Sequence, residues 1–208
     1  MEIILVRHGQ TALNAARTFR GRLDVGLDET GRRQAAALGA YLAPRPLEAV
    51  YSSPLRRATE TARAIARPHG LRVRRLDGLL DMDFGQWQGL TADEVRHRYP
   101  QAYADWLSAP HRVRVPGGEG LAEVRQRAVP AVGAVVSRHS GAVVLVSHRV
   151  VLKVLVCALL GLDSSHFWNI RLDTCGLTTF SYQDGRYVLA GHNDTSFLEG
   201  PGQGLPDF

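Results

Sequence analysis

Short apolar runs alternate with longer amphipathic segments along the chain, a pattern typical of an α/β protein. The apolar runs predict buried strands at residues 2–7, 49–51 and 143–147, a weaker strand at 71–76, and a hairpin of 176–182 with 186–190. Helices are predicted at residues 28–42, 54–67 after an N-cap at Ser53, 121–138 and 150–160, with two pieces at 91–108 that Pro100 separates. This alternation predicts an α/β three-layer sandwich around a mostly parallel sheet.

One segment, from about residue 77 to residue 120, interrupts this alternation because it holds few strand signals. We interpret it as a helical lid that lies over one end of the sheet. No internal repeat is present, and 208 residues predict a single domain, residues 1–208, with the lid as a subdomain. The Gly/Pro-rich stretch after Asp194 is expected to fray.

Composition excludes several classes of protein. Hydrophobic residues make up 45% of the chain and charged residues 22%, which argues against a disordered, collagen-like or membrane protein. The N-terminal apolar run is too short for a signal peptide, and the run at 150–160, interrupted by Lys153, falls short of the ~20 residues of a membrane span. Cys157 and Cys175 make no disulfide framework. We therefore expect a cytoplasmic protein without a membrane partner.

The chain is basic, with a formal net charge of +5, and every cationic side chain except Lys153 is an arginine. A general arginine bias on a solvated surface explains this, and so does an anionic ligand, because guanidinium forks match phosphate oxygens. No helix-turn-helix, zinc or aromatic stacking signature indicates a nucleic-acid partner. The positions of the arginines therefore have to decide between the first two explanations.

Two histidines, His8 and His148, each come directly after a predicted buried strand. In open α/β sheets, ligands bind beyond the carboxyl ends of the strands, so both side chains are expected in one crevice. Either histidine alone is more simply interpreted as a loop residue with satisfied hydrogen bonds. Two at strand ends are less easily explained by chance.

Arg57 occupies an unusual place in the predicted helix that follows Ser53. A solvated stripe of that helix carries Arg56, Glu60, Arg63 and Arg67. Arg57 lies off this stripe and in the first turn, where free N–H groups and the helix dipole favour an anion. Arg7, at the end of a core strand, faces inward in the same way. Each needs an anionic ligand or an acidic partner such as Asp81 or Asp83.

Paired histidines also suit zinc, which takes His, Cys and carboxylate ligands. Neither Cys157 nor Cys175 has the spacing of a zinc site, and two nearby arginines would repel a dication. The same arginines would attract a phosphate. The sequence therefore favours phosphoryl chemistry over a metal site.

Several segments in order carry a resemblance to a known family. They are LVRHGQT at 5–11, Asn14, FRGRLDVGLDETGRRQA at 19–35, SSPLRRATETA at 52–62, LLDMDFGQWQG at 79–89, PGGEG at 116–120 and VLVSH ending at His148. Together they resemble the histidine phosphatase superfamily, in the branch that contains cofactor-dependent phosphoglycerate mutases and phosphatase relatives such as α-ribazole phosphatases.

The resemblance implies a role for each matching residue. His8 would attack phosphorus and become a phosphohistidine. Arg7, Arg57 and His148 would bind the equatorial phosphoryl oxygens, and no metal or other cofactor would be needed. Asn14 is expected to touch the phosphate, and the backbone at Gly21 to approach the substrate.

The proton donor to the leaving oxygen corresponds to Asp81, where the family usually has glutamate. We expect Phe84 and Trp87 to surround this carboxyl with apolar groups, and Asp83 is the alternative donor. Two other departures are Gln88, which replaces a common glutamate, and Arg149, which replaces a glycine of many relatives. Arg149 is expected to turn outward.

The resemblance allows more than one activity. The segment from 88 to 116 is shorter than the loops that shield phosphohistidine in the family's mutases, which favours a hydrolase acting on a small phosphorylated metabolite. A cofactor-dependent phosphoglycerate mutase is the alternative, and a non-catalytic phosphate-binding protein is a third reading. Lid residues that could touch substrate, or more simply pack, are His97, Tyr99, Tyr103, Trp106 and Arg112. The hairpin after Gly176 could join two copies in a homodimer.

Overall fold

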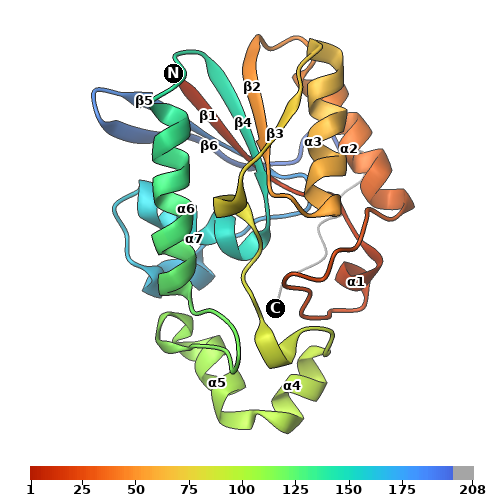
Figure 1. Ribbon diagram of the computed structural model, residues 1–208, viewed down its shortest axis with the longest axis vertical. Coiled ribbons are helices and arrows are strands. Elements are labelled where there is room, and N and C mark those ends of the chain that lie inside the picture. The colour runs from red at the N-terminus through yellow and green to blue at the C-terminus, as the bar shows by residue number, and fades with distance from the viewer. Residues whose placement is uncertain (199–208) are drawn as a thin grey trace.

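The computed structural model describes residues 1–198, which build a six-stranded sheet with helices on both faces (Figure 1). The strands are β1 (Glu2–Arg7), β2 (Leu47–Ser52), β3 (Val73–Arg75), β4 (Ala142–Ser147), β5 (Leu177–Gln183) and β6 (Arg186–Asp194). They lie in the order β3-β2-β4-β1-β5-β6. Strands β3, β2, β4 and β1 pair in parallel, and β5 and β6 are antiparallel, which confirms the predicted mostly parallel sheet.

Seven α-helices lie within the described residues. They are α1 (Ala12–Ala15), α2 (Glu29–Leu42), α3 (Arg56–Ala66), α4 (Ala92–Arg98), α5 (Pro100–Ser108), α6 (Leu121–Val136) and α7 (Arg149–Leu159). The short helix α1 and the 3-10 segment at Ser164–Asn169 were not expected from the sequence. The other helices fall where the amphipathic pattern predicts them.

Alternate residues of the central strands enter two separate hydrophobic clusters, because successive side chains of a strand point to opposite faces. Ile3 and Leu5 of β1 pack in one cluster with side chains of α6 and α7. Ile4 and Val6 pack in the other with side chains of α2 and α3. The predicted sandwich of three layers is therefore confirmed.

The start of α3 differs from the expectation that Ser53 is its N-cap. The helix begins at Arg56, with Leu55 as the N-cap residue in an extended conformation. The Ser53 hydroxyl instead lies 2.8 Å from Nε2 of His148. The tertiary contact therefore sets where the helix begins, two residues later than the Ser-Pro signal predicts.

The parallel strands end at one edge of the sheet, and this edge gathers segments that are far apart in the sequence. The backbone N–H of His8, just after β1, donates to the carbonyl oxygen of Ser147 at 3.0 Å. The N–H of Ser53, just after β2, donates to the carbonyl oxygen of Val146 at 2.9 Å. Residues that follow β1, β2 and β4 therefore meet at one place.

The segment from 77 to 120 holds helices α4 and α5, which lie beyond one end of the sheet in Figure 1. Trp106 of α5 is buried and packs edge-on against Trp87 and Trp168, with ring centroids 6.2 and 5.9 Å away. Trp106 therefore packs in the hydrophobic core, as the simpler of the two interpretations predicts. That this segment acts as a lid over a substrate stays a prediction.

Within residues 1–198, no helix combines the length and the apolar character needed to cross a bilayer. Cys157 and Cys175 are both free and buried. Most of the Gly/Pro-rich tail, residues 199–208, lies outside the described residues. A cytoplasmic location and a homodimer through the β5–β6 hairpin stay predictions.

We expect Trp106→Ala to lower the free energy of unfolding by about 3–5 kcal/mol, because it removes a buried aromatic ring and leaves a cavity. Leu107→Ala, at the adjacent but 45% exposed position, should change it by no more than about 0.5 kcal/mol. Urea denaturation of both variants measures the difference. Equal losses would mean that α5 is not anchored through Trp106.

Candidate active site

His8 is completely buried, and its hydrogen bonds define where its proton lies. Nδ1 is 2.7 Å from the carbonyl oxygen of Gly9. Since a carbonyl oxygen only accepts, Nδ1 carries the proton and Nε2 keeps its lone pair. Nε2 has no hydrogen-bond partner among the described residues. The ring therefore presents an unprotonated nitrogen for attack on an electrophile.

The surroundings of His8 keep its ring neutral. Burial holds the pKa of His8 well below its usual range, and the nearby guanidinium groups of Arg57, Arg7 and Arg20 lower it further. Burial disfavours the charged imidazolium, and each neighbouring cation repels it. A neutral imidazole with a free Nε2 lone pair is a competent nucleophile near neutral pH.

His148 lies beside His8, with ring centroids 5.2 Å apart, and its proton sits on the other nitrogen. Its Nδ1 accepts a hydrogen bond from Nε of Arg57 at 3.2 Å, so Nε2 carries the proton and donates to the Ser53 hydroxyl at 2.8 Å. Burial, then Arg57 and His8, keep the pKa of His148 well below its usual range. The second histidine is therefore a neutral hydrogen-bond donor.

Arg57 is buried and points inward, as its position on α3 predicts. Its two terminal nitrogens donate to the carbonyl oxygens of Leu23 and Gly21, each at 2.7 Å. The nitrogen bound to Gly21 also forms an ion pair with Oδ2 of Asp81 at 3.0 Å. Burial lowers the pKa of Arg57, whereas the charge of Asp81 raises it. Of the two acidic partners considered, the structure pairs Asp81 with this arginine.

Asp81 and Asp83 lie in different surroundings. Oδ2 of Asp81 is 3.6 Å from Nδ1 of His148, beyond hydrogen-bond length, and the side chain is almost fully buried. Asp83 instead lies 3.5 Å from Arg22, and its side chain is 28% exposed. Of the two carboxyls, that of Asp81 therefore lies beside His148.

The surroundings of Asp81 include charged and polar groups. Its side chain is paired with Arg57 and accepts from the backbone N–H of Met82 at 2.9 Å. Phe84 and Trp87 pack against Phe19, with ring centroids 5.1 and 5.2 Å away. That these two rings also surround the Asp81 carboxyl stays a prediction.

Arg127 of α6 holds the backbone that carries Asp81. Its guanidinium donates to the carbonyl oxygens of Gly78, Leu80 and Asp81, at 3.0, 2.7 and 3.0 Å. Glu119 fixes the guanidinium from the other side at 2.9 Å. A fixed backbone holds the Asp81 carboxyl beside Arg57 and His148.

Arg7 and Asn14, both named from the sequence, occupy defined places. Arg7 is buried and donates to the carbonyl oxygen of Leu172 at 2.6 Å, and its charge acts on His8. Oδ1 of Asn14 accepts from the backbone and hydroxyl of Thr11, at 3.0 and 2.8 Å, which shapes α1. An approach of Asn14 to phosphate stays a prediction.

Gly21 is required by its backbone. Its φ of +48° lies in the left-handed region, and a Cβ atom there would come within 2.3 Å of Oε1 of Gln88. The same oxygen accepts from the N–H of Arg22 at 2.6 Å. Gln88 thus braces the turn whose carbonyl oxygen holds Arg57.

Arg20 belongs to this site although the sequence analysis did not single it out. Its Nε is buried without a hydrogen-bond partner among the described residues. Burial, then Arg7, lower the pKa of Arg20 to about 9, although the charge of Asp81 opposes the shift. The sequence signal that could have identified Arg20 is its position directly before Gly21, where the backbone was expected to approach the substrate. Ser53 was likewise missed, because its Ser-Pro sequence is typical of a helix start.

Arg149 does not turn outward as expected. It is 8% exposed, its guanidinium lies 6.0 Å from the ring centroid of Trp168, and its charge lowers the pKa of Arg20. Arg149 is the first residue of α7, and helical Cα–Cβ bonds tilt toward the N-terminus, which here begins at the strand edge. Its side chain is directed back toward the site rather than to solvent.

Several arginines gather at the site. The charges of Arg7, Arg57 and Arg149 all act on Arg20, and Asp81 is paired with Arg57. Among the described residues, no group of three or more His, Cys, Asp or Glu side chains is placed to hold a metal ion. The charge and the guanidinium donors suit an anion such as a phosphoryl group.

Comparison with known proteins gives a consistent match. Residues 3–195 match the model of the family described as Histidine phosphatase superfamily (branch 1). Phosphoserine phosphatase 1 of Hydrogenobacter thermophilus is 37% identical over 95% of this chain and 94% of its own. A relative from Yersinia pestis named "Probable phosphoglycerate mutase" is 30% identical over 97% of this chain and 96% of its own. A solved mycobacterial glucosyl-3-phosphoglycerate phosphatase is 32% identical, with a TM-score of 0.87 over 93% of this chain and 99% of its own.

Two buried neutral histidines predict a loss of stability in mild acid. Because both have folded-state pKa values well below 6.5, the unfolded chain binds more protons than the folded one as the pH falls below 6.5. We expect the free energy of unfolding to decrease there by about 1.4 kcal/mol per pH unit for each histidine. Urea denaturation at several pH values measures this slope. In the His8→Asn variant, the decrease of the unfolding free energy per pH unit should be smaller by the contribution of one histidine. The same slope in the variant and the unchanged protein would contradict a buried neutral His8.

Proposed function

Because this chain belongs to the histidine phosphatase superfamily, we propose that it hydrolyses phosphomonoesters through a phosphohistidine at His8. The protein is a phosphatase of this family; the reaction path and the residue roles are our proposal. The observation that carries it is the buried, unprotonated Nε2 of His8, which has no hydrogen-bond partner within residues 1–198 and lies among guanidinium groups.

In the first step, Nε2 of His8 attacks phosphorus. The N–P bond forms as the bond from phosphorus to the ester oxygen breaks, and the positive charge of the ring is shared with its Nδ1–H, which the Gly9 carbonyl oxygen holds. Arg57 and Arg7 supply donors for the equatorial oxygens of the transferring group. The Nε2–H of His148 adds a further donor when it exchanges the Ser53 hydroxyl for a phosphoryl oxygen. Fixed cations and dipoles of this kind stabilise the charge of the transition state without having to reorganise.

We assign both proton transfers of the reaction to Asp81. Its carboxyl gives a proton to the departing alkoxide, and in the second step the resulting carboxylate takes a proton from the water that attacks the phosphohistidine. Inorganic phosphate leaves and Nε2 of His8 regains its lone pair. Since Asp81 is paired with Arg57 before substrate binds, the phosphoryl group competes with that carboxylate for the same guanidinium. The approach of a phosphate anion to the carboxyl favours its protonated form.

Hydrolysis is favoured over mutase chemistry by the short segment between residues 88 and 116 and by the relatives. Two of the three similar proteins described above are named phosphatases, and one is named a mutase. The mutase reaction, in which a second phosphorylated acid accepts the group instead of water, is therefore the second candidate.

The substrate we propose is a small phosphorylated metabolite that carries a further anionic group. The mutual electrostatic interactions of Arg7, Arg20, Arg57 and Arg149 put several guanidinium groups at the site, and guanidinium forks bind carboxylates as well as phosphates. Phosphoserine and glucosyl-3-phosphoglycerate, which the names of two relatives mention, are both phosphorylated acids. We propose that the reaction needs no metal ion.

Replacement of the nucleophile tests the proposal most directly. We expect His8→Asn to abolish phosphate release, while His111→Asn, at an exposed histidine, leaves it unchanged. Enzyme quenched in alkali during turnover should carry acid-labile phosphate on the unsubstituted protein and none on His8→Asn. Turnover by the His8 variant would refute the assignment. Transfer that requires a bisphosphorylated primer, with no release of inorganic phosphate, would favour the mutase.

The role of Asp81 can be separated from that of its neighbour. We expect Asp81→Asn to slow hydrolysis of an alkyl phosphate by about 10²–10⁴-fold, because an alkoxide needs a proton to leave. p-Nitrophenyl phosphate, whose leaving group needs none, should be affected far less. Asp83→Asn should leave both rates near those of the unchanged protein. An equal effect of Asp81→Asn on the two esters would show that Asp81 is not the acid.

A further inference from the structure

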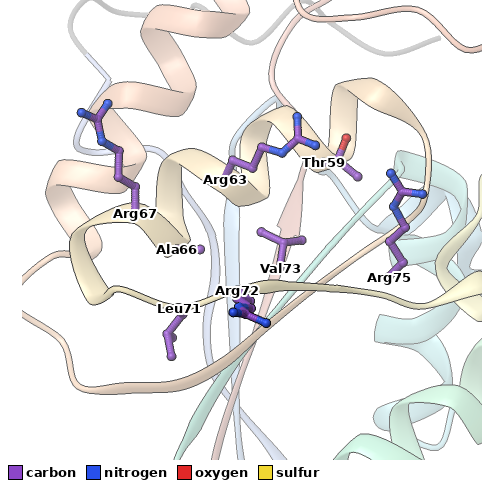
Figure 2. A pocket seen from close by; sticks show the side chains of 8 residues that line it. All are labelled: Thr59, Arg63, Ala66, Arg67, Leu71, Arg72, Val73 and Arg75. Atoms are coloured by element: carbon purple, nitrogen blue, oxygen red, sulfur yellow. The ribbon is translucent and has the colours of Figure 1, made fainter.

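A second concentration of arginines lies outside the site, around a hollow between α3 and β3 (Figure 2). The hollow has a volume of about 510 Å³ and is lined by Thr59, Arg63, Ala66, Arg67, Leu71, Arg72, Val73 and Arg75. We call these residues the α3–β3 groove. Figure 2 shows Arg63 and Arg67 rising from the helix, and Arg72 and Arg75 coming from the strand side. The four arginines therefore border one hollow from two sides.

The local structure explains why these residues border one hollow. Thr59 and Arg63 of α3, and Arg67 directly after its last residue, are spaced by four residues. On β3, Val73 and Arg75 point to the sheet face that α3 covers, whereas Arg74 points to the other face and donates to the hydroxyl of Tyr51. Regular secondary structure thus places Arg63 and Arg75, and the short connection before β3 places Arg72.

No anion of the protein neutralises the groove. The lining residues include no carboxylate, and within residues 1–198 none of the four guanidinium groups forms a side-chain hydrogen bond or an ion pair. Other exposed arginines do have such partners: Arg33 pairs with Glu29, and Arg96 with Asp93. A like-charged cluster without a counter-ion gains most from a bound anion.

We propose that the α3–β3 groove binds a small ligand that carries two or more phosphate groups. A single phosphate has a charge of about −2, which leaves half of the four positive charges unbalanced, whereas a di- or triphosphate matches them. The volume lies within the range of about 300–1,000 Å³ that small-molecule sites occupy. Ala66, Leu71 and Val73 give the floor an apolar part that a nucleoside can contact.

The alternatives account for less of the geometry. Cations on an edge strand such as β3 discourage pairing with another sheet, but that role does not need Arg63 and Arg67 on the facing helix. Single-stranded nucleic acid is held by a basic track with aromatic side chains on which bases stack, and no aromatic residue lines the groove. A compact polyphosphate fits both the charge and the shape.

Inorganic tripolyphosphate is the first probe. Its binding is measured by calorimetry to protein that carries His8→Ala, which prevents turnover, with and without the added pair Arg63→Gln and Arg72→Gln. We expect this pair of substitutions to weaken binding by at least about tenfold, since it removes one guanidinium group from the helix side of the groove and one from the strand side. The matched control adds Arg138→Gln and Arg186→Gln, exposed arginines on other elements, and should weaken binding by less than about twofold.

The outcomes are distinct. Loss of binding confined to the groove pair supports the site, while equal loss in both pairs, or none in either, overturns it. ATP that binds as well as tripolyphosphate, with AMP much weaker, identifies the triphosphate of a nucleotide as a source; tripolyphosphate alone identifies the inorganic chain. Tighter binding of a single-stranded RNA, lost in the variant with Arg63→Gln and Arg72→Gln, would overturn the proposal of a small ligand.

The same two substitutions on an intact His8 background should leave phosphate release unchanged. A failure of the groove proposal therefore does not bear on the proposed reaction.

Discussion

Complete burial of an imidazole among guanidinium groups is the constraint on which this structure depends. The ring of His8 has lost its contact with water, and in the same space Arg7, Arg20 and Arg57 oppose any positive charge on it. Such an arrangement is stable only while the ring stays neutral, and neutrality is also what a nitrogen nucleophile requires. In the proposed reaction, the burial that disfavours a charged ring therefore also provides the nucleophile. The bond from Nδ1 to the Gly9 carbonyl oxygen fixes which nitrogen is reactive.

The cations themselves are held by oxygen atoms of the backbone as much as by carboxylates. Arg57 is bound by two carbonyl oxygens and one carboxylate. Arg127 is bound by three carbonyl oxygens and one carboxylate, that of Glu119. Carbonyl oxygens orient a guanidinium without cancelling its charge, so the site keeps a net attraction for an anion. Had Arg57 been fixed by two carboxylates instead, its field would have been neutralised. Asp81 is the exception, because its carboxylate forms an ion pair with Arg57, the pairing that a phosphoryl group would have to compete with in the proposed reaction.

The sequence predicts the parts of this site that depend on local rules. Short apolar strands followed by a histidine put His8 and His148 at strand ends, and the helical spacing turns Arg57 inward. What it could not supply are facts that depend on packing between distant segments. Ser53 has the sequence of an N-cap, but a contact with His148 gives it another role. Arg149 looked like a solvated cation because nothing local shows that α7 starts at the crowded edge of the sheet.

Helix α3 shows why composition alone could not decide what the arginines do. Arg57 and Arg63 lie on the same helix, within two turns of each other, and are the same residue type. The first is buried against carbonyl oxygens, a carboxylate and an imidazole, and the second borders an open hollow whose lining residues include no carboxylate. A compositional bias toward arginine accounts for the presence of both residues. It does not account for the complete burial of Arg57, since a buried cation is unstable without partners. The partners that surround each guanidinium, and not the number of arginines, therefore assign its role.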